Sequence, residues 1–407
     1  MSPARIVETP NDKPAFPDLG LYVVGVAPCY PERHNPQKEG LRNYATKMYP
    51  MTPALDKVLA IADNAGIDYR ACAFENDSDF LTSPEPPTLA RQRELYLTVG
   101  VGLTVNAARK AIAEWGGSPA EITHIVGVSS TTFSNPGMDY FVAQALGLRP
   151  DVERVLLHGV GCAGGLAGLR TAAQLACAAT LLRRPARVLI VACELGTVSL
   201  RTELDIITKT QEVHIPVALF ADAGSALILS NTVGAEPHKP VYELLGWEQT
   251  TVPETGGDIT FDITPGGWHA GLTHRVPKIA STALPPAFAS LTSRLPASSP
   301  AAPTDASEYD WAIHPGGAKV LLDAQKVMGL TPEHTRASWD VYRRHGNTSS
   351  ATIFSVLSRL REPEMGKGRS HVLACAFGPG VVVEGCVLRR CELGGDSGSE
   401  DEGTAAQ

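Results

Sequence analysis

Three observations predict an α/β fold for this chain. Its 407 residues are 43% hydrophobic and 19% charged, so the chain can bury a large core and form two packed units. Short runs rich in Val and Ile alternate with longer helical patterns, which is typical of buried strands layered against helices. The order of strand, turn and helix in the first half of the chain also recurs in the second half.

The strands and helices can be placed from their residue patterns. Runs rich in Val and Ile predict strands at 21–28, 122–130, 154–160, 187–194 and 225–230. Residues 100–116 and 166–184 have apolar side chains at helical spacing and predict two helices. Residues 284–306 are rich in Pro, Ala and Ser, and they predict a surface excursion that follows a helix.

An internal repeat relates the two halves of the chain. In the first half, 33 residues separate Ser129, at a strand end, from Cys162, in a turn before a helix. The same 33 residues separate His314 from Asn347 in the second half. The repeat predicts a duplicated unit, with one half at 1–235 and the other at 236–392. Cys162 and Asn347 would then be equivalent helix-start positions that face one shared cavity.

The composition argues against several functional classes. Lys and Arg number 35 against 43 Asp and Glu, so we expect no nucleic-acid binding. The eight cysteines include no C-x-x-C pair, which predicts neither a disulfide framework nor a zinc site and favours the reducing cytoplasm. We expect no signal peptide and no membrane span, because polar residues interrupt the most apolar stretch, 155–182. Residues 393–407 form an acidic, Gly- and Ser-rich tail that we expect to be disordered.

The stretch HGVGCAGGLAG, residues 158–168, allows two functional interpretations. Its glycines have the G-x-G-x-x-G spacing of a dinucleotide loop, but the first acidic residue is Glu194, about 30 residues further on instead of ~20. Alternatively, the loop presents Cys162 at a helix start, where the helix dipole favours a thiolate and lowers the cysteine pKa below ~8.5. We favour a nucleophilic cysteine. A small core cysteine in a tightly packed helix remains the structural alternative.

A nucleophilic cysteine needs a base and hydrogen-bond donors for the oxyanion that develops during acyl transfer. His314, in WAIHPGG, follows a strand, and Asn347, in RRHGNTSSA, precedes a helix. Both positions are where loops line cavities, so these residues are candidates. His345, two residues before Asn347, is a further candidate for the base.

Four motifs carry a resemblance to a known family. GVGCAGGLAGLR, WAIHPGG, GNTSSATI and AFGPGVVVEG, in this order and at these separations, resemble the type III polyketide synthases, the chalcone-synthase-like branch of the thiolase superfamily. The similarity spans about residues 20–390, and MYPMTPALDKVLAIADNAGIDYRAC with LFADAGSALILSN is most similar to the fungal members.

The resemblance implies a thiolase fold of five layers, αβαβα, built from the two duplicated halves, and a homodimer. It also implies catalysis by Cys162, His314 and Asn347 with no metal and no cofactor other than the coenzyme A of the substrates. Cys162 would hold a starter from acyl-CoA as a thioester. His314 and Asn347 would stabilise the enolate formed by decarboxylation of malonyl-CoA, and this enolate would extend the chain by two carbons before cyclisation.

The same resemblance assigns substrate-binding roles. Phe220 would be a gatekeeping aromatic between the coenzyme A tunnel and the cavity, and Lys57 would contact the coenzyme A phosphates. The loop Gly378-Pro379-Gly380 would keep its family shape. Ala376 replaces the first glycine of this motif, and alanine is acceptable there if the residue does not need a positive φ.

Other positions depart from the family pattern. Ala60 and Asn64 stand where basic residues are expected, so phosphate binding would use other residues such as Arg70. A second gatekeeping phenylalanine has no counterpart between Phe261 and Phe288. Trp268, His269 and Leu272 lie in that interval instead.

Ser199 stands where plant members have a threonine that shapes the cavity, and its smaller side chain would leave more room. Together with the fungal resemblance, this predicts a long-chain fatty acyl starter and an alkylpyrone or alkylresorcinol product. The alternatives are a ketoacyl-carrier-protein synthase III-like enzyme that performs one condensation, and a non-catalytic acyl-CoA-binding protein of the same fold.

Overall fold

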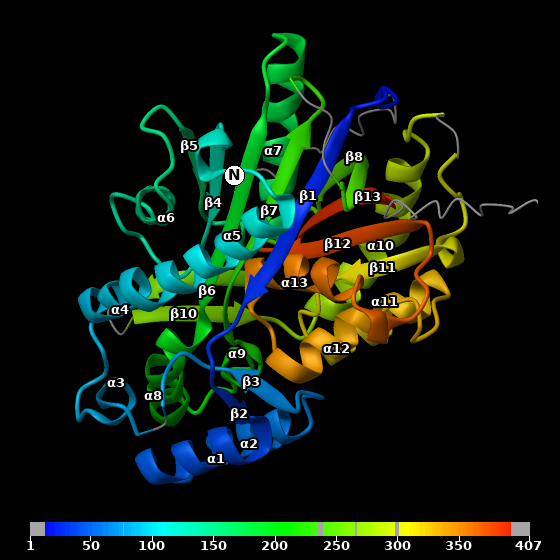
Figure 1. Cartoon of the computed structure of the whole chain (residues 1–407). Coiled ribbons are helices and arrows are strands. Elements are labelled where there is room, and N and C mark those ends of the chain that lie inside the picture. Colours follow the sequence, from blue (N-terminus) through cyan, green and yellow to red (C-terminus); the bar gives the residue numbers. More distant parts are fainter. Residues whose placement is uncertain (1–12, 76, 235–238, 265–266, 298–300, 392–407) are drawn as a thin grey trace, which may run out of the picture.

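The computed structural model describes residues 13–75, 77–234, 239–264, 267–297 and 301–391. The predicted disordered tail, 393–407, lies outside these residues. The frame of the molecule is a nine-stranded mixed sheet in the order β11-β12-β13-β8-β1-β7-β6-β4-β5 (Figure 1). Its strands are β1 Leu21–Cys29, β4 His124–Val128, β5 Glu153–Leu157, β6 Arg187–Leu195, β7 Asp222–Asn231, β8 Tyr242–Thr251, β11 Tyr309–Ile313, β12 His371–Gly378 and β13 Val382–Arg390.

Two short ribbons accompany this sheet. One pairs β2, His34–Pro36, with β3, Tyr69–Ala71, and the other pairs β9, Ile259–Thr264, with β10, Gly267–Leu272. The helices are α1 Gln37–Met48, α2 Pro53–Asp63, α3 Asp79–Thr82, α4 Leu89–Leu95, α5 Val101–Trp115, α6 Met138–Leu146, α7 Gly164–Leu181, α8 Leu200–Thr210, α9 Pro216–Leu219, α10 Val276–Thr292, α11 Ala318–Met328, α12 Arg336–His345 and α13 Thr352–Arg359. The five predicted strands and the two predicted helices are all present. No described helix has the length and apolar character needed to cross a membrane.

The strand order shows the predicted duplication. In the first half, β4 and β6 are parallel, and β7 and β1 follow as antiparallel neighbours. In the second half, β11 and β12 are parallel, and β13 and β8 follow as antiparallel neighbours. The two halves meet where β1 pairs with β8 over Tyr22↔Glu243 and Val23↔Tyr242. The same order of four strands therefore recurs in both halves, and β5 extends the first half by one parallel strand.

Helices α7 and α13 form the central layer, because each of them contacts strands of both halves. Helices α5 and α6 cover the outer face of the first half, and α10 packs with α11 on the outer side of the second half (Figure 1). This arrangement gives the five layers αβαβα of the expected thiolase fold. It places the N-terminal ends of α7 and α13 side by side, since the turns that precede these two helices contact each other.

Strands between two helical layers must be apolar on both faces. In β6, Val188 and Ile190 enter the central core, whereas Leu189 and Val191 enter the core under α5. This two-sided burial explains why the strand forms an unbroken apolar run in the sequence.

One sequence expectation is wrong. Residues 284–306 were predicted to lie outside a helix, but α10 continues to Thr292 and contains Pro285 and Pro286. Leu284 and Leu291 are buried in the outer core of the second half, and this burial outweighs the loss of two backbone N–H donors at the prolines. Of the residues between α10 and the short turn Ala306–Glu308, those that the structure describes, 293–297 and 301–305, are non-helical.

A buried carboxylate ties together the far edge of the sheet. Asp310 on β11 is fully buried and accepts hydrogen bonds from Arg336 at 2.7 Å, Arg369 at 3.1 Å and Arg390 at 2.8 Å. Burial alone would raise the pKa of Asp310, but the bonds from Arg336 and Arg390 outweigh it, and the pKa lies below its ordinary value. The network therefore stabilises the fold fully at pH values above the ordinary pKa of an aspartate.

We expect Asp310→Asn to lower the free energy of unfolding by about 3 kcal/mol, because three guanidinium groups lose their counter-charge. Urea denaturation at pH 7 measures this change. The depressed pKa makes the contribution of Asp310 disappear as pH falls through the folded-state value, so wild type and variant should converge in strongly acidic solution. A variant as stable as wild type at pH 7 would contradict this account.

Candidate active site

The turn that carries Cys162 is a short 3₁₀ segment, Gly161–Ala163, that leads directly into α7. Gly161 has φ +49°, and a Cβ on this residue would lie 2.6 Å from the ring of Pro379. Both facts require glycine here. The absence of a side chain lets the Gly378-Pro379-Gly380 loop pack directly on the cysteine turn.

The position of Ala376 agrees with the condition stated for this loop. Ala376 lies within β12, paired with Glu384, so it needs no positive φ. Gly378 approaches the cysteine turn so closely that an added Cβ would lie 2.5 Å from the carbonyl oxygen of Val160.

We expect Gly378→Ala to lower product formation by about tenfold to a hundredfold, because displacing the cysteine turn by about 1 Å misplaces the sulfur. Gly385→Ala on β13 is the matched control, since its Cβ would meet the nearest atom at 3.6 Å, an ordinary contact. Steady-state product formation compares the two variants, and circular dichroism checks their folding. Equal activity of both variants would show that the loop does not position Cys162.

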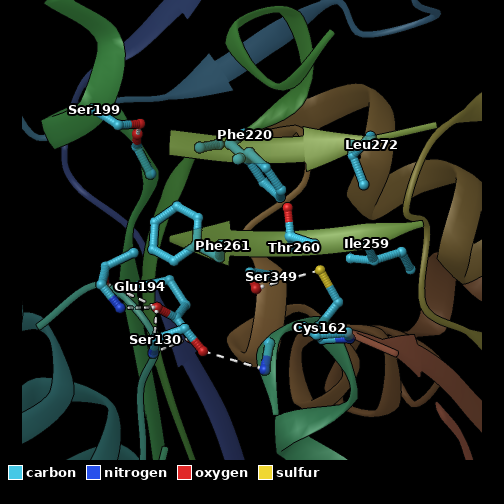
Figure 2. A pocket seen from close by; sticks show the side chains of 16 residues that line it. Ser130, Cys162, Glu194, Ser199, Phe220, Ile259, Thr260, Phe261, Leu272 and Ser349 are labelled. Carbon is cyan, nitrogen blue, oxygen red and sulfur yellow. Dashed lines mark hydrogen bonds between the residues drawn. The ribbon is translucent and has the colours of Figure 1, made fainter. Parts of the chain in front are cut away.

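Cys162 contacts residues from the second half of the chain. Its Sγ donates a hydrogen bond to Oγ of Ser349 at 3.3 Å (Figure 2). Ser349 has φ +50°, a strained backbone conformation for a residue other than glycine. The backbone N–H of Ser349 donates to Oδ1 of Asn347 at 2.8 Å, so the strained turn links the thiol to the asparagine amide.

Asn347 is held by its backbone and by its side chain. Its N–H donates to the carbonyl of Leu219, and its carbonyl accepts from the N–H of Ala221, so it brackets Phe220 as a short bridge. Its Nδ2 donates to the carbonyl of Gly316 at 3.3 Å, two residues after His314. The Asn347 amide therefore has a fixed orientation.

His314 follows β11 and is 1% exposed. Its backbone N–H donates to Cys375 on β12, and its ring lies next to Gly316. Neither ring nitrogen has a hydrogen-bond partner. A buried imidazole with two unpartnered nitrogens is rare in a folded protein and calls for an explanation.

The charge state of Cys162 differs from the sequence expectation. Burial raises the pKa of the thiol to about 11, although hydrogen bonds from Ser349 and Asn347 favour the thiolate. Burial also lowers the pKa of the His314 imidazole to about 3. The position of Cys162 at the start of α7 does not lower the pKa of the thiol enough to offset desolvation. Neither group ionises by itself, so a thiolate forms only if a neighbouring base takes up its proton.

A buried carboxylate supports the floor of the site. Glu194, at the end of β6, accepts hydrogen bonds from the backbone N–H of Ser130 and of Thr131, and from Oγ of Ser350 at 2.6 Å. Burial raises the pKa of Glu194 to about 7. In turn, Oγ of Ser130 accepts from the N–H of Gly161 at 3.2 Å, so the chain of bonds ends at the cysteine turn.

Cys162 opens into a pocket whose empty space, counted together with its solvent-open mouth, is about 550 Å³. In Figure 2 the sulfur lies near Ile259 and Thr260 of β9, with Ser199 and Glu194 at the other end of the pocket. The lining residues are Ser130, Thr131, Gly161, Cys162, Glu194, Gly196, Ser199, Phe220, Ala221, Ile259, Thr260, Phe261, Ala270, Leu272, Ser349 and Pro379.

Of the predicted substrate-binding residues, Ser199, Phe220 and Pro379 line this cavity. Lys57 is exposed on α2. The suggestion that Arg70 binds phosphate is wrong, because Arg70 is buried and donates to the carbonyl of Val217.

His345 packs in a different cluster, with His34 and Tyr30. Its Nδ1 lies 2.9 Å from Nε2 of His34, and its ring stacks on Tyr30 at 3.6 Å between centroids. These contacts argue against His345 as the base of the cavity.

Part of the cavity wall was not predicted from the sequence. Phe261 and Leu272 come from the hairpin β9–β10 and face the cavity (Figure 2). Ser349 was also missed, although its position two residues after Asn347 in the GNTSS motif was a usable signal.

Comparisons with known proteins settle the family. Residues 73–237 match the model for chalcone and stilbene synthases, N-terminal domain, and residues 243–392 match the corresponding C-terminal domain. The type III polyketide synthase pspB of Penicillium soppii is 40% identical over 93% of this chain and 98% of its own length.

The chain belongs to the type III polyketide synthases. It is also 38% identical to the acylalkylpyrone synthase csyB of Aspergillus oryzae, over 92% of this chain and 96% of csyB. A crystal structure of CsyB complexed with CoA-SH superimposes with a TM-score of 0.87 at 38% identity, over 91% of this chain and 100% of that one. A type III pentaketide synthase from Neurospora crassa gives a TM-score of 0.87 at 45% identity, with the same coverage.

These findings confirm that the chain is an acyltransferase of the polyketide synthase class with the thiolase-like fold. They decide against the ketoacyl-carrier-protein synthase III-like alternative.

Proposed function

We propose that this synthase loads a long-chain fatty acyl group from acyl-CoA onto Cys162, extends it with malonyl-CoA, and cyclises the product to an alkylpyrone or alkylresorcinol. The observation that carries the proposal is His314, which is buried with both ring nitrogens unpartnered and has its ring next to Gly316. The carbonyl of Gly316 accepts from the Asn347 amide, and Asn347 is linked through Ser349 to the thiol. The ring nitrogens of His314 gain hydrogen-bond partners only when a substrate oxygen or the Cys162 proton reaches them.

The burial of Cys162 and His314 determines how the loading step begins, because a buried site disfavours a net charge. His314 takes the proton of the Cys162 thiol, so the thiolate and the imidazolium form as a pair and the buried site keeps no net charge. The thiolate attacks the acyl-CoA carbonyl, the thioester forms on Cys162, and coenzyme A leaves as the thiol after it receives the proton.

The extension step uses the same two side chains as donors. An N–H of His314 and Nδ2 of Asn347 stabilise the enolate oxygen that develops when malonyl-CoA loses carbon dioxide, and one such donor contributes about 3 kcal/mol. The enolate carbon then attacks the carbonyl of the thioester on Cys162, the Cys162 thiolate leaves, and the extended chain remains as a coenzyme A thioester that can reload onto the cysteine. The reaction needs no cofactor beyond the coenzyme A thioesters, because the malonyl carboxylate supplies the electron pair.

The cavity wall supports an aliphatic starter. Ser199 leaves space at one end, while Phe220, Phe261 and Leu272 provide apolar surface. The similarity to csyB, an acylalkylpyrone synthase, supports the same product class.

Incubation with malonyl-CoA and fatty acyl-CoA starters of increasing length, followed by mass spectrometry, tests the function. We expect cyclised products with several added two-carbon units and a preference for long starters. Ser199→Leu should shift the preference to shorter starters, whereas Ser199→Ala, which keeps the space, should not. Linear products with a single extension, or no product, would refute the proposal and would favour a non-catalytic acyl-CoA-binding protein in the latter case.

A cytoplasmic homodimer is part of the proposal. Strand β5 is the edge of the sheet, and exposed apolar side chains gather around it: Leu156 on the strand, Tyr140 under Arg154, and Phe133 against His158. An exposed apolar edge is best covered by a second copy. Light scattering coupled to size-exclusion chromatography measures the mass of the protein in solution.

We also propose that the halves 1–235 and 236–392 act as one catalytic unit.

A further inference from the structure

Three potential metal ligands meet where α8, the loop after it and β10 come together. Glu203 belongs to α8, His214 to the loop between α8 and α9, and His269 to β10, and their ligand atoms all lie within 4.8 Å of one another. Glu203 and His214 are buried, and His269 is partly buried. The reaction proposed above uses none of the three.

The distances suit one ion. Nδ1 of His214 is hydrogen-bonded to Oε2 of Glu203 at 3.1 Å, a bond that a metal ion would replace. Nδ1 of His269 lies 3.5 Å from Oε1 of the same carboxylate. Ligands of a tetrahedral Zn²⁺ stand about 3.3 Å apart when the metal–ligand bonds are about 2.0 to 2.1 Å. The rings of His214 and His269 have centroids 4.7 Å apart, so both can face the same point.

The hydrogen bonds around the cluster leave a place for a cation. Nδ1 of His269 is buried and makes no hydrogen bond, although a carboxylate lies nearby. Glu203 is oriented independently, because the backbone N–H of Ala270 donates to its Oε1 at 2.8 Å. A buried nitrogen without a partner, beside an oriented carboxylate and a second imidazole, is the arrangement of an incomplete ligand set.

The outer partner of His214 also fits metal ligation. Nε2 of His214 lies 3.7 Å from a carboxylate oxygen of Glu212. Histidines that bind a metal through one nitrogen commonly donate through the other to a carboxylate, which fixes the ring and raises its basicity. Glu212 would take this role while Nδ1 of His214 faces the ion.

We propose that Glu203, His214 and His269 bind a structural divalent transition-metal ion, Zn²⁺, with water as the fourth ligand. Two imidazoles and one carboxylate favour Zn²⁺ over Ca²⁺ or Mg²⁺, which prefer oxygen ligands. The ion joins α8 to the hairpin β9–β10, which forms one wall of the Cys162 cavity. It holds this wall in place and takes no part in bond making.

The sequence predicted no metal site because of the spacing of these residues along the chain. His214 and His269 are separated by 55 residues, and neither belongs to a short metal-binding motif. Only the fold brings them to one carboxylate.

Binding of Co²⁺ and Zn²⁺ to the purified, chelator-treated protein tests the site without any substrate. We expect one equivalent of Co²⁺ to give visible d–d absorption bands of a tetrahedral site, displaced by one equivalent of Zn²⁺. His269→Gln and His214→Gln should each weaken Zn²⁺ binding by about tenfold or more, since the loss of a ligand costs at least as much as the loss of an outer partner. His274→Gln is the matched control, because His274 is exposed just beyond β10.

A melting experiment gives an independent readout. Zn²⁺ should raise the melting temperature of wild type and of His274→Gln but not of His269→Gln. His269→Gln removes no hydrogen bond of the Nδ1 atom, so we expect it to fold, and circular dichroism checks this. Absence of metal uptake by wild type, or equal Zn²⁺ affinity of His269→Gln and wild type, would overturn the proposal. Neither outcome depends on polyketide formation, so the proposed function is tested separately.

Discussion

Replacement of Cys162 by alanine is expected to lower polyketide formation by about 10⁴-fold or more, because no other group can hold the growing chain as a thioester. Decarboxylation of malonyl-CoA should persist, since it depends on the donors of His314 and Asn347. Liquid chromatography with mass spectrometry measures the polyketide, and release of labelled carbon dioxide measures decarboxylation.

Cys177→Ala is the matched control. Cys177 lies on the same helix, α7, and is partly buried, but it does not line the cavity in the part of the chain that the structure describes. The control should keep wild-type activity. If Cys162→Ala made polyketide at normal rates, Cys162 would be a core residue of a glycine-rich helix, the alternative that its sequence context allows.

The positions of the strands in the first half were predictable because helices cover the sheet on both faces. Strand β6 is apolar at every position that enters either core, and such a run is visible in a single sequence. The equal spacing of Ser129 to Cys162 and of His314 to Asn347 also reflects the duplicated unit, because the same strand, turn and helix must recur for the same sheet order to form.

Other features depend on packing that sequence patterns do not record. Strand β9, ITFDIT, alternates apolar and polar residues as a half-buried strand does, but only the position of the hairpin β9–β10 over the cavity shows that Phe261 and Leu272 are wall residues. Helix α10 continues through two prolines because Leu284 and Leu291 are buried on either side of them. The protonation of Cys162 follows from burial, which no motif reveals.

His314→Ala should impair both loading and decarboxylation, whereas His314→Gln should separate them. Glutamine cannot act as a base near neutral pH, so in both variants we expect the acyl-enzyme to form about 10³-fold more slowly. The glutamine amide still offers an N–H donor, so decarboxylation should fall by about 10²- to 10³-fold in His314→Ala and by less in His314→Gln. Intact-mass spectrometry after rapid mixing measures loading.

The pH dependence of Cys162 alkylation distinguishes a base from a structural residue. Burial raises the pKa of the thiol to about 11, so without the imidazole the thiolate fraction, and with it the rate of reaction with iodoacetamide, should be very low at pH 7 and rise continuously into alkaline solution. In wild type, His314 takes the proton and the labelling rate should already be high near neutral pH. Identical pH profiles for wild type and His314→Gln would mean that His314 does not activate the thiol, because a residue with only a packing role does not accept the proton of Cys162.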